Sequence, residues 1–230
     1  MCTAAVYRTK DTYFGRTLLL IFAYELAIAN YQSLIERRIP MSDFEAELIH
    51  HAAPTLLGRK QSNLFSLPLS LLPKCREEIA LYGKKLAEKG ICIVYLYSFK
   101  NRVFIMVYRQ NAMMRYLRVP HVRDYLISLG YPARIGKKDA MTETLAHLRK
   151  RMQADGDFPH EIGFFLGYPP ADVFAFMREK GQNYKCVGFW KVYGDEKRAL
   201  RIFQCYRDCR DQMMEQVTAG SSILSLLGAA

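Results

Sequence analysis

The order of hydrophobic and polar residues along the chain alternates between two periods, one typical of helices and the other typical of strands. Apolar residues that recur every three or four positions predict amphipathic helices. Short runs rich in β-branched and aromatic residues, closed by glycine, proline or a polar turn, predict strands. Helices are expected over residues 17–38, 42–57, 73–90, 111–117, 121–129, 141–153, 169–181 and 195–217, and strands over 91–99, 103–109, 160–168 and 185–193.

Several element boundaries carry chemical signals. Ser42 and Glu45 form an S-x-x-E capping box at the start of the second helix. Pro73 and Gly90 suit the first turn and the end of the third helix, since proline lacks a donor and glycine tolerates a left-handed backbone. The polar residues 100–102 separate two consecutive strands, which are therefore expected to pair as a hairpin.

Together these elements predict an α+β fold, with a mixed sheet of about four or five strands and flanking helices. An apolar segment, a proline, a helix ending in Lys-Gly and an aromatic strand occur in this order at 64–98 and again at 161–193. This echo suggests two β-α-β units that share one sheet. We expect an N-terminal extension over 1–40, a single α+β domain over 41–217 and a frayed tail over 218–230.

Positive charge adds a candidate partner to this picture. The chain has a formal net charge of +11 and a pI of about 9.4, which favours anionic partners such as nucleic acid, nucleotides or acidic lipid. Residues 115–151 hold nine basic side chains and three acidic ones, a surplus of six. A solvated basic face and an anion-binding surface are both consistent with this charge run.

The cysteines and the N-terminal apolar run bear on the compartment. The six cysteines contain no C-x-x-C pair, which favours reduced thiols in the cytoplasm over a zinc site or a redox motif. The run after Arg16 resembles a signal peptide, but Glu25 interrupts it and Asp11 lies where basic residues are needed. It is also shorter than the roughly 20 apolar residues that span a bilayer. The sequence therefore predicts a cytoplasmic protein without a membrane span.

One loop has the composition of an anion site. Residues 58–63 (GRKQSN) follow the end of a helix, and Arg59, Lys60 and Asn63 could surround an anion held in a nest of backbone N–H groups. A plain loop that terminates the helix is the alternative.

Histidines supply the remaining candidate chemistry. His160 and Glu161 could act as acid and base or as metal ligands, or could serve only a turn; without a second histidine at i+4 the zinc-protease pattern fails. Because neighbours on a helix point about 100° apart, at most one of His50 and His51 is available to a site. No phosphate-binding glycine motif is present, and we predict neither a cofactor nor a metal.

Aromatic residues in the predicted strands leave two alternatives open. In a regular strand Tyr95, Tyr97 and Phe99 share one face. They belong to the core if helices cover both faces of the sheet. On a bare face beside the basic region they would form a platform on which bases stack, as in RNA-binding sheets.

The C-terminal half carries a resemblance to a known family. The segment FPHEIGFFLGYPPADVFAFMREKGQNYKCVGFWKVYGD contains the pieces PHEIG, FLGYP, DV and GFWKVY, the upstream piece is HHAAPTLLGRKQSNLF, and VYR at 107–109 fits the middle. In this order they resemble the bacterial domain-of-unknown-function family 3793 over residues 41–212. That resemblance implies no established activity.

The first 18 residues resemble a different family. MCTAAVYRTKDTYFGRTL is similar to the start of a choloylglycine hydrolase, a linear amide C–N hydrolase. The resemblance implies that Cys2 is the nucleophile after loss of Met1 and that Arg16 is the active-site arginine. The family's aspartate falls here on Leu19, and its later active-site residues are missing. We therefore expect residues 1–40 to be a truncated start joined to an intact second protein.

Three functional hypotheses follow. The first is a non-enzymatic module that binds an anionic ligand or nucleic acid through residues 115–151 and the loop at 58–63. The second is a small-ligand binder or enzyme whose cleft gathers the motif residues His51, Arg59, Lys60, Asn63, Arg109, His160 and Glu161. The third, which we disfavour because the rest of that fold is absent, is amide hydrolysis by Cys2.

Overall fold

The computed structural model describes residues 41–154 and 159–227. The expected extension over 1–40 lies outside these residues, and so do its helix over 17–38 and the candidate residues Cys2 and Arg16. Among the described helices, none combines the length and the apolar character needed to cross a bilayer.

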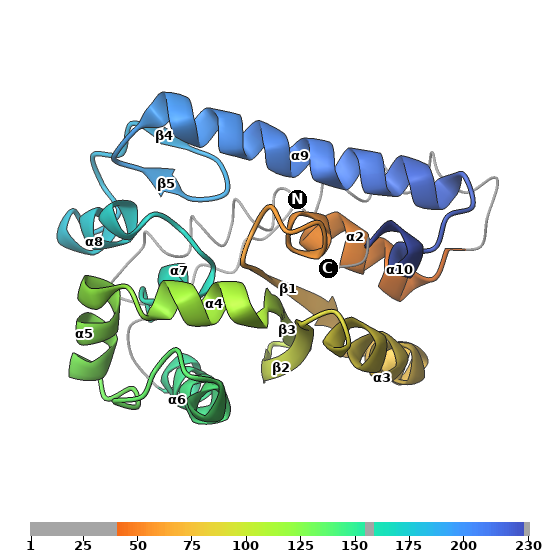
Figure 1. Ribbon diagram of the computed structural model, residues 1–230, viewed down its shortest axis with the longest axis horizontal. Coiled ribbons are helices and arrows are strands. Elements are labelled where there is room, and N and C mark those ends of the chain that lie inside the picture. Colours follow the sequence, from red (N-terminus) through yellow and green to blue (C-terminus); the bar gives the residue numbers. More distant parts are fainter. Residues whose placement is uncertain (1–40, 155–158, 228–230) are drawn as a thin grey trace.

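Figure 1 shows the elements in the order of the chain. They are α2 (Asp43–Leu56), β1 (Ser62–Pro68), α3 (Leu72–Ala87), β2 (Ile91–Phe99), β3 (Arg102–Arg109), α4 (Gln110–Leu117), α5 (Pro120–Ser128), the 3-10 helix η1 (Lys138–Ala140), α6 (Met141–Gln153), α7 (Ile162–Phe165), α8 (Pro170–Arg178), β4 (Cys186–Val187), β5 (Lys191–Val192), α9 (Glu196–Thr218) and α10 (Ile223–Leu226).

The main sheet has three strands in the order β1–β3–β2, and each neighbouring pair is antiparallel. β1 and β2 therefore run in the same direction, and α3 connects them while β3 lies between them. The expected hairpin of β2 and β3 is confirmed, and its turn places Lys100 and Asn101 at positive φ. The expected capping box of α2 is also confirmed, with Ser42 and Glu45 bonding reciprocally.

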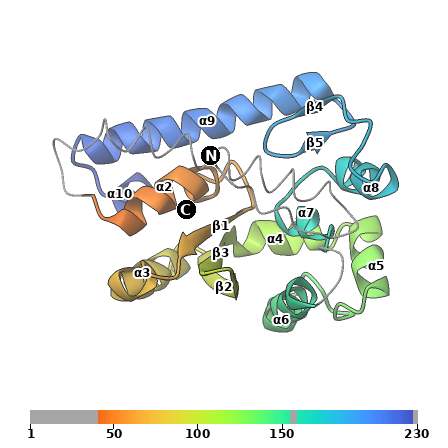
Figure 2. The same ribbon diagram turned by 180° about the vertical axis from the view of Figure 1, so that it is seen from behind.

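Helices cover both faces of this sheet. Val103 and Ile105 of β3 point into a core shared with α2, α3 and α9, whereas Phe104 and Met106 point into a second core built with α4, α5, α6 and α7. β3 is buried on both sides, which explains its continuous apolar sequence. Figures 1 and 2 show α9 running along α2 on one side of the sheet, with α4, α5 and α6 grouped beyond it.

The described part of the C-terminal tail, residues 218–227, contains a buried helical turn. Residues 223–226 form α10, capped by Ser222, and the side chains of Ile223 and Leu227 lie in the core with α2 and α9. The tail is uncharged but carries apolar side chains at the spacing of one helical turn, and their burial holds it in place.

The α+β class is confirmed, although the five described strands form two antiparallel sheets instead of one mixed sheet. The prediction of a strand over 160–168 was wrong, because the short helix α7 occupies this segment. The strand expected over 185–193 is a small hairpin of β4 and β5. The segment 161–193 therefore lacks the first strand of a β-α-β unit, and it shares no sheet with 64–98.

A bulge changes which aromatic side chains of β2 are exposed. The register shifts between Tyr95 and Tyr97, so Leu96 and Tyr97 are both buried. Tyr95 and Phe99 remain 46% and 43% exposed. Regular alternation along β2 was therefore a wrong expectation, because an extra residue in one strand turns the following side chains to the other face. Tyr97 belongs to the core, stacked on Phe104, while Tyr95 lies at the surface.

Candidate functional site

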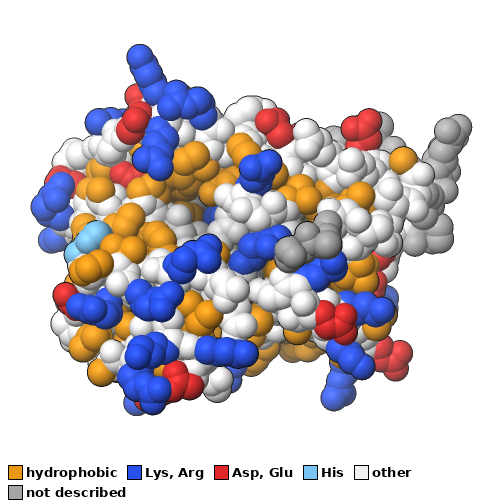
Figure 3. Space-filling view, in the orientation of Figure 1, with side chains coloured by type: hydrophobic (Ala, Val, Ile, Leu, Met, Phe, Trp, Pro, Cys, Tyr) orange, Lys and Arg blue, Asp and Glu red, His pale blue; other side chains and the backbone are white. Residues whose placement is uncertain are grey.

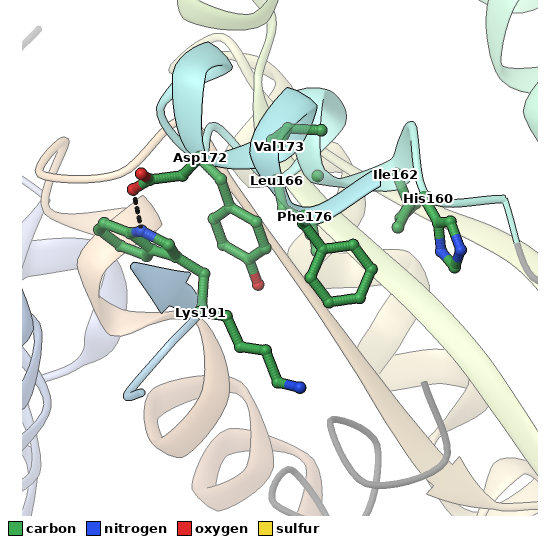
Figure 4. A pocket seen from close by; sticks show the side chains of 10 residues that line it. His160, Ile162, Leu166, Asp172, Val173, Phe176 and Lys191 are labelled. Atoms are coloured by element: carbon green, nitrogen blue, oxygen red, sulfur yellow. Dashed lines mark hydrogen bonds between the residues drawn. The ribbon is translucent and has the colours of Figure 1, made fainter. Parts of the chain in front are cut away.

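An aromatic pocket lies between α7, α8 and β5 (Figure 4). Its walls are mainly apolar, and its cavity volume is about 70 Å³, the space of a few methyl or methylene groups and well below the roughly 150 Å³ that accommodates benzene. The lining residues include Ile162, Leu166, Tyr168, Val173, Phe176 and Trp190, with His160, Asp172 and Lys191 as polar members.

Asp172 holds one wall of this pocket together. Its buried carboxylate accepts hydrogen bonds from the indole N–H of Trp190 at 2.7 Å and from the backbone N–H groups of Tyr193 and Gly194 at 3.0 and 2.8 Å. These three bonds fasten α8 to the β5 side of the small hairpin. Because the carboxylate is occupied by the protein itself, its role in the pocket is structural.

Lys191 and His160 are the other polar groups of the pocket. The Lys191 amine is buried and donates a hydrogen bond to the carbonyl of Gly181 at 2.8 Å. It also lies 4.7 Å from the ring centre of Tyr184, a cation–π distance. The His160 ring contacts Phe176 edge to face, at 5.1 Å between centroids.

A second buried lysine borders the same aromatic wall. The ring of Tyr168 stacks on Trp190 at 5.4 Å between centroids, and the Lys60 amine lies 5.5 Å from the centre of the Tyr168 ring. On α9, Tyr206 presents a second ring at 5.9 Å from the same amine. Lys60 is 6% exposed, so its charge is largely removed from water.

Burial sets the ionisation of this cluster. It lowers the pKa of Lys60 from 10.5 to about 7, because the charged amine loses its hydration. It raises the pKa of Tyr168 and that of Tyr206 for the same reason, since in a phenol the charged form is the deprotonated one. Lys60 is therefore a partly neutral amine at neutral pH, flanked by two protonated phenols.

Of the two alternatives for the loop before β1, an anion nest or a plain end of the helix, the hydrogen bonds agree with the second. The backbone N–H groups of Arg59 and Lys60 both donate to the carbonyl of Pro54, at 2.8 and 3.0 Å, and that of Gly58 donates to Thr55. The Asn63 side chain accepts a hydrogen bond from the Thr55 hydroxyl at 2.6 Å. The loop thus closes the end of α2, which is the plain helix-terminating role, and Arg59 is exposed on its outside.

Arg109 completes this closure. Its guanidinium donates to the carbonyl oxygens of Thr55 and Leu56, at 2.7 and 2.6 Å, in the last turn of α2. A cation there also matches the negative end of the helix dipole. Burial lowers the pKa of Arg109. The arginine predicted to line a cleft therefore caps a helix.

Two of the recognised motifs do contact each other. The Gln61 side-chain amide donates to the carbonyls of Phe164 and Phe165, at 2.7 and 2.9 Å, and the Ser62 hydroxyl also donates to Phe165. These bonds satisfy carbonyls at the end of α7 and fix it against the start of β1. The upstream loop and the GFFLGY segment are thus joined next to Lys60 and Tyr168.

The other predicted residues point elsewhere. His51 lies 3.2 Å from the Glu47 carboxylate, one turn earlier in α2, and its ring stacks on that of Phe65 in β1. Glu161 is buried and accepts hydrogen bonds from Arg151 and from the Tyr131 hydroxyl. The predicted cleft that gathers His51, Arg109, His160 and Glu161 is therefore absent from the described residues, and Glu161 fastens α6 to the segment before α7.

A positively charged surface lies on the side of the main sheet that α4, α5 and α6 cover. Figure 3 shows Lys and Arg side chains gathered over the part of the molecule that contains α4, α5 and α6. Arg123, Arg134 and Arg151 pair with acidic neighbours. We call the following exposed residues, for which no ion pair is seen in the described part of the chain, the basic face: Arg115, Arg118, Lys137, Lys138, Arg149 and Lys150.

An exposed aromatic ring adjoins the basic face. The Arg149 guanidinium lies 5.5 Å from the centre of the Tyr95 ring and donates to the Tyr95 carbonyl at 2.8 Å. The half-exposed ring is therefore oriented by a cation, an arrangement that also suits stacking of a base.

Sequence reasoning missed much of the pocket. Asp172, Trp190 and Lys191 lie in the DV and GFWKVY pieces that carried the family resemblance, so the motif itself was the available signal. Tyr206, which borders Lys60 and not the pocket, gave no such signal, since it is one of several residues on the buried face of α9. In the described residues, no group of three or more His, Cys, Asp or Glu side chains is arranged to hold a metal ion.

A family model described as a protein of unknown function (DUF3793) matches residues 48–227. No curated protein and no solved structure matches the chain.

Proposed function

The chain belongs to the DUF3793 family of proteins of unknown function, and because that membership assigns no activity, we propose that it is a non-enzymatic binding module for an anionic partner. The basic face supplies the contact surface, and the Tyr95 ring beside it favours a single-stranded nucleic acid over other polyanions.

The observation that carries this proposal is the group of six cations without carboxylate partners on one side of the molecule. A cation that already pairs with a carboxylate must give up that ion pair to bind a phosphate, so its net gain in binding free energy is small. A cation without such a partner loses only water and counterions when the phosphate binds. Arg115 lies in α4, whereas Lys137 and Lys138 lie at the start of η1, so an extended polyanion can contact cations from separate elements of the basic face.

Binding of a single-stranded RNA at several salt concentrations tests the proposal. Each phosphate contact should steepen the fall of log K with log salt by about 0.7. We expect a slope that corresponds to several contacts and retention on heparin at about 0.15 M salt. Absence of both would refute the proposal. Polyglutamate of similar length is the matched polyanion without bases. If it binds more weakly than the RNA, stacking of a base on Tyr95 contributes to RNA binding.

A second candidate function rests on the aromatic pocket. A small, partly open apolar cavity with Lys191 and His160 at its wall suits part of a small ligand with a polar end. Native mass spectrometry of the protein purified from its own host tests this candidate. A bound small molecule that is lost on Phe176→Trp substitution, which fills the cavity, supports it; a protein of unmodified mass with no ligand contradicts it.

A further inference from the structure

The amine of Lys60 lies among aromatic rings without an anionic partner. In the part of the chain that the structure describes, its side chain makes cation–π contacts with Tyr168 and Tyr206, and no ion pair or hydrogen bond to it is seen. A buried ammonium normally has a carboxylate or several acceptors, since burial of an unpaired charge is costly. The position therefore favours loss of the proton.

The pKa of Lys60 agrees with this geometry. Burial lowers the pKa of Lys60 to about 7, so about half of the molecules carry a neutral amine at pH 7. Only the neutral amine has the lone pair that attacks an electrophile, and desolvated lysines are the ones that enzymes and carriers use in this way.

The surroundings favour an electrophile over a simple anion. The neighbouring backbone N–H groups of residues 58–60 are occupied by carbonyls of α2, so they add no donors for an anion. The apolar cavity of about 70 Å³ is lined by Tyr168 and not by Lys60 itself, so a compound that reaches the amine from this cavity is limited to a short carbon chain without a large or highly charged group.

The Lys60 backbone is held firmly. Its N–H donates to the carbonyl of Pro54, and the next residue, Gln61, donates through its side chain to Phe164 and Phe165. The backbone at Lys60 is therefore fixed in position. A reactive side chain needs such a fixed backbone if it is to meet its target in a defined geometry.

We propose that Lys60 is a nucleophilic amine that binds small aldehydes or ketones covalently, as an imine, beside the rings of Tyr168 and Tyr206. The amine lone pair forms a bond to the carbonyl carbon, and the carbonyl oxygen takes up a proton to give a carbinolamine. Loss of water then breaks the C–O bond and leaves a C=N bond, with the second amine proton leaving in that water. No oxidant or reductant is needed, and hydrolysis reverses the reaction.

Reductive trapping tests this proposal. The folded full-length protein is incubated with propanal and cyanoborohydride at pH 7, and the propylated lysines are located by peptide mass mapping. We expect Lys60 to react roughly tenfold faster than the exposed residues Lys84 and Lys85 of α3, because a larger neutral fraction outweighs the lower basicity. The Lys60 rate should rise with pH and level off above about pH 7, whereas the rates of the exposed lysines keep rising.

Matched controls make the result decisive. In concentrated urea the advantage of Lys60 should vanish, because it depends on the fold. Lys60→Arg keeps the charge and removes the nucleophile, so the label at this position should be lost, while Tyr206→Phe keeps the ring and should keep the label. If Lys60 in the folded protein reacts no faster than Lys84 and Lys85, or if its advantage persists in urea, the proposal is wrong.

This inference is independent of the proposed function. Lys60 is not part of the basic face, so failure of the trapping experiment leaves heparin and RNA binding unaffected. Conversely, loss of polyanion binding on substitution of the basic face has no bearing on the imine.

Discussion

The carboxylate of Asp172 in α8 accepts a hydrogen bond from the indole N–H of Trp190, with 2.7 Å between nitrogen and oxygen, and so links the helix to the β4–β5 hairpin. Two more backbone N–H groups, those of Tyr193 and Gly194, share the same carboxylate. A single side chain of the helix therefore fixes the position of the small hairpin, and with it one wall of the aromatic pocket.

Removal of this carboxylate should be costly. Asp172→Ala leaves three donors unpaired, one of them the buried indole N–H, and we expect a loss of about 3 kcal/mol in the free energy of unfolding. Because Trp190 is the single tryptophan of the chain, its fluorescence during urea unfolding measures the effect. Asp211→Ala is the matched control, since this exposed carboxylate pairs only at the surface and should contribute less than about 1 kcal/mol. Equal effects of the two substitutions would contradict the assigned role of Asp172.

Two glycines should respond in opposite directions to the same change. A methyl group at Gly188, in the β4–β5 turn, would overlap the buried ring of Phe203 on α9, so Gly188→Ala should destabilise by roughly 2 kcal/mol. Gly83 lies within α3 with no neighbour in the space that a methyl group would fill, so Gly83→Ala should stabilise by about 0.5–1 kcal/mol. Thermal unfolding midpoints measure both. Stabilisation by Gly188→Ala would show that the hairpin does not pack against α9 as described.

Lys60 should lower the stability of the protein in a pH-dependent manner. Its folded-state pKa of about 7 lies below the ordinary value of 10.5. Between these two values the unfolded chain binds a proton that the folded chain has released, so the free energy of unfolding rises with pH, by at most about 1.4 kcal/mol per unit. Below pH 7 both states are protonated and the full penalty applies.

The variant Lys60→Met has no such group. We expect it to be more stable than the parent protein by on the order of 2 kcal/mol at pH 7, with the difference shrinking toward pH 10. Urea unfolding at several pH values gives the comparison. A Met variant that is less stable at pH 7 would mean that the lysine charge is compensated in the folded protein.

Charge reversal on the basic face should weaken polyanion binding. We expect the triple substitution Arg115→Glu, Lys137→Glu and Lys138→Glu to abolish retention on heparin and to lower the salt slope of RNA binding by about two units. Lys197→Glu with Arg201→Glu on the exposed side of α9 is the control, because it also alters surface charge but lies away from α4–α6. Similar losses in both variants would indicate binding by net charge instead of by this face.

Much of the helical framework was readable from the sequence. The capping box at Ser42 and the separation of α4 from α5 by Pro120 are local signals, and local hydrogen bonds decide such boundaries. The segment 160–168 was misread because a short buried apolar run has no period that separates a helix from a strand. Its helix is set by tertiary contacts: a methyl group at Gly163 would approach Val173 to 2.9 Å, so α7 packs closely against α8.

The candidate site was only partly predictable for the same reason. Lys60 was found because it lies in a basic loop, but its ionisation depends on Tyr168 and Tyr206, which are 108 and 146 residues further along the chain. Arg109 and Glu161 have the composition of functional residues, yet each is used to join two elements of the fold. No local pattern distinguishes a charged residue that serves packing from one that serves a ligand.

The bulge between Tyr95 and Tyr97 also affects how copies of the protein meet one another. β2 is an outer strand of the sheet, and a straight outer strand offers a row of free N–H and C=O groups to any similar strand in a crowded solution. Here the bulge interrupts that row and the Arg149 side chain occupies the Tyr95 carbonyl. The irregularity that exposes an aromatic ring at the surface therefore also protects the chain against edge-to-edge polymerisation.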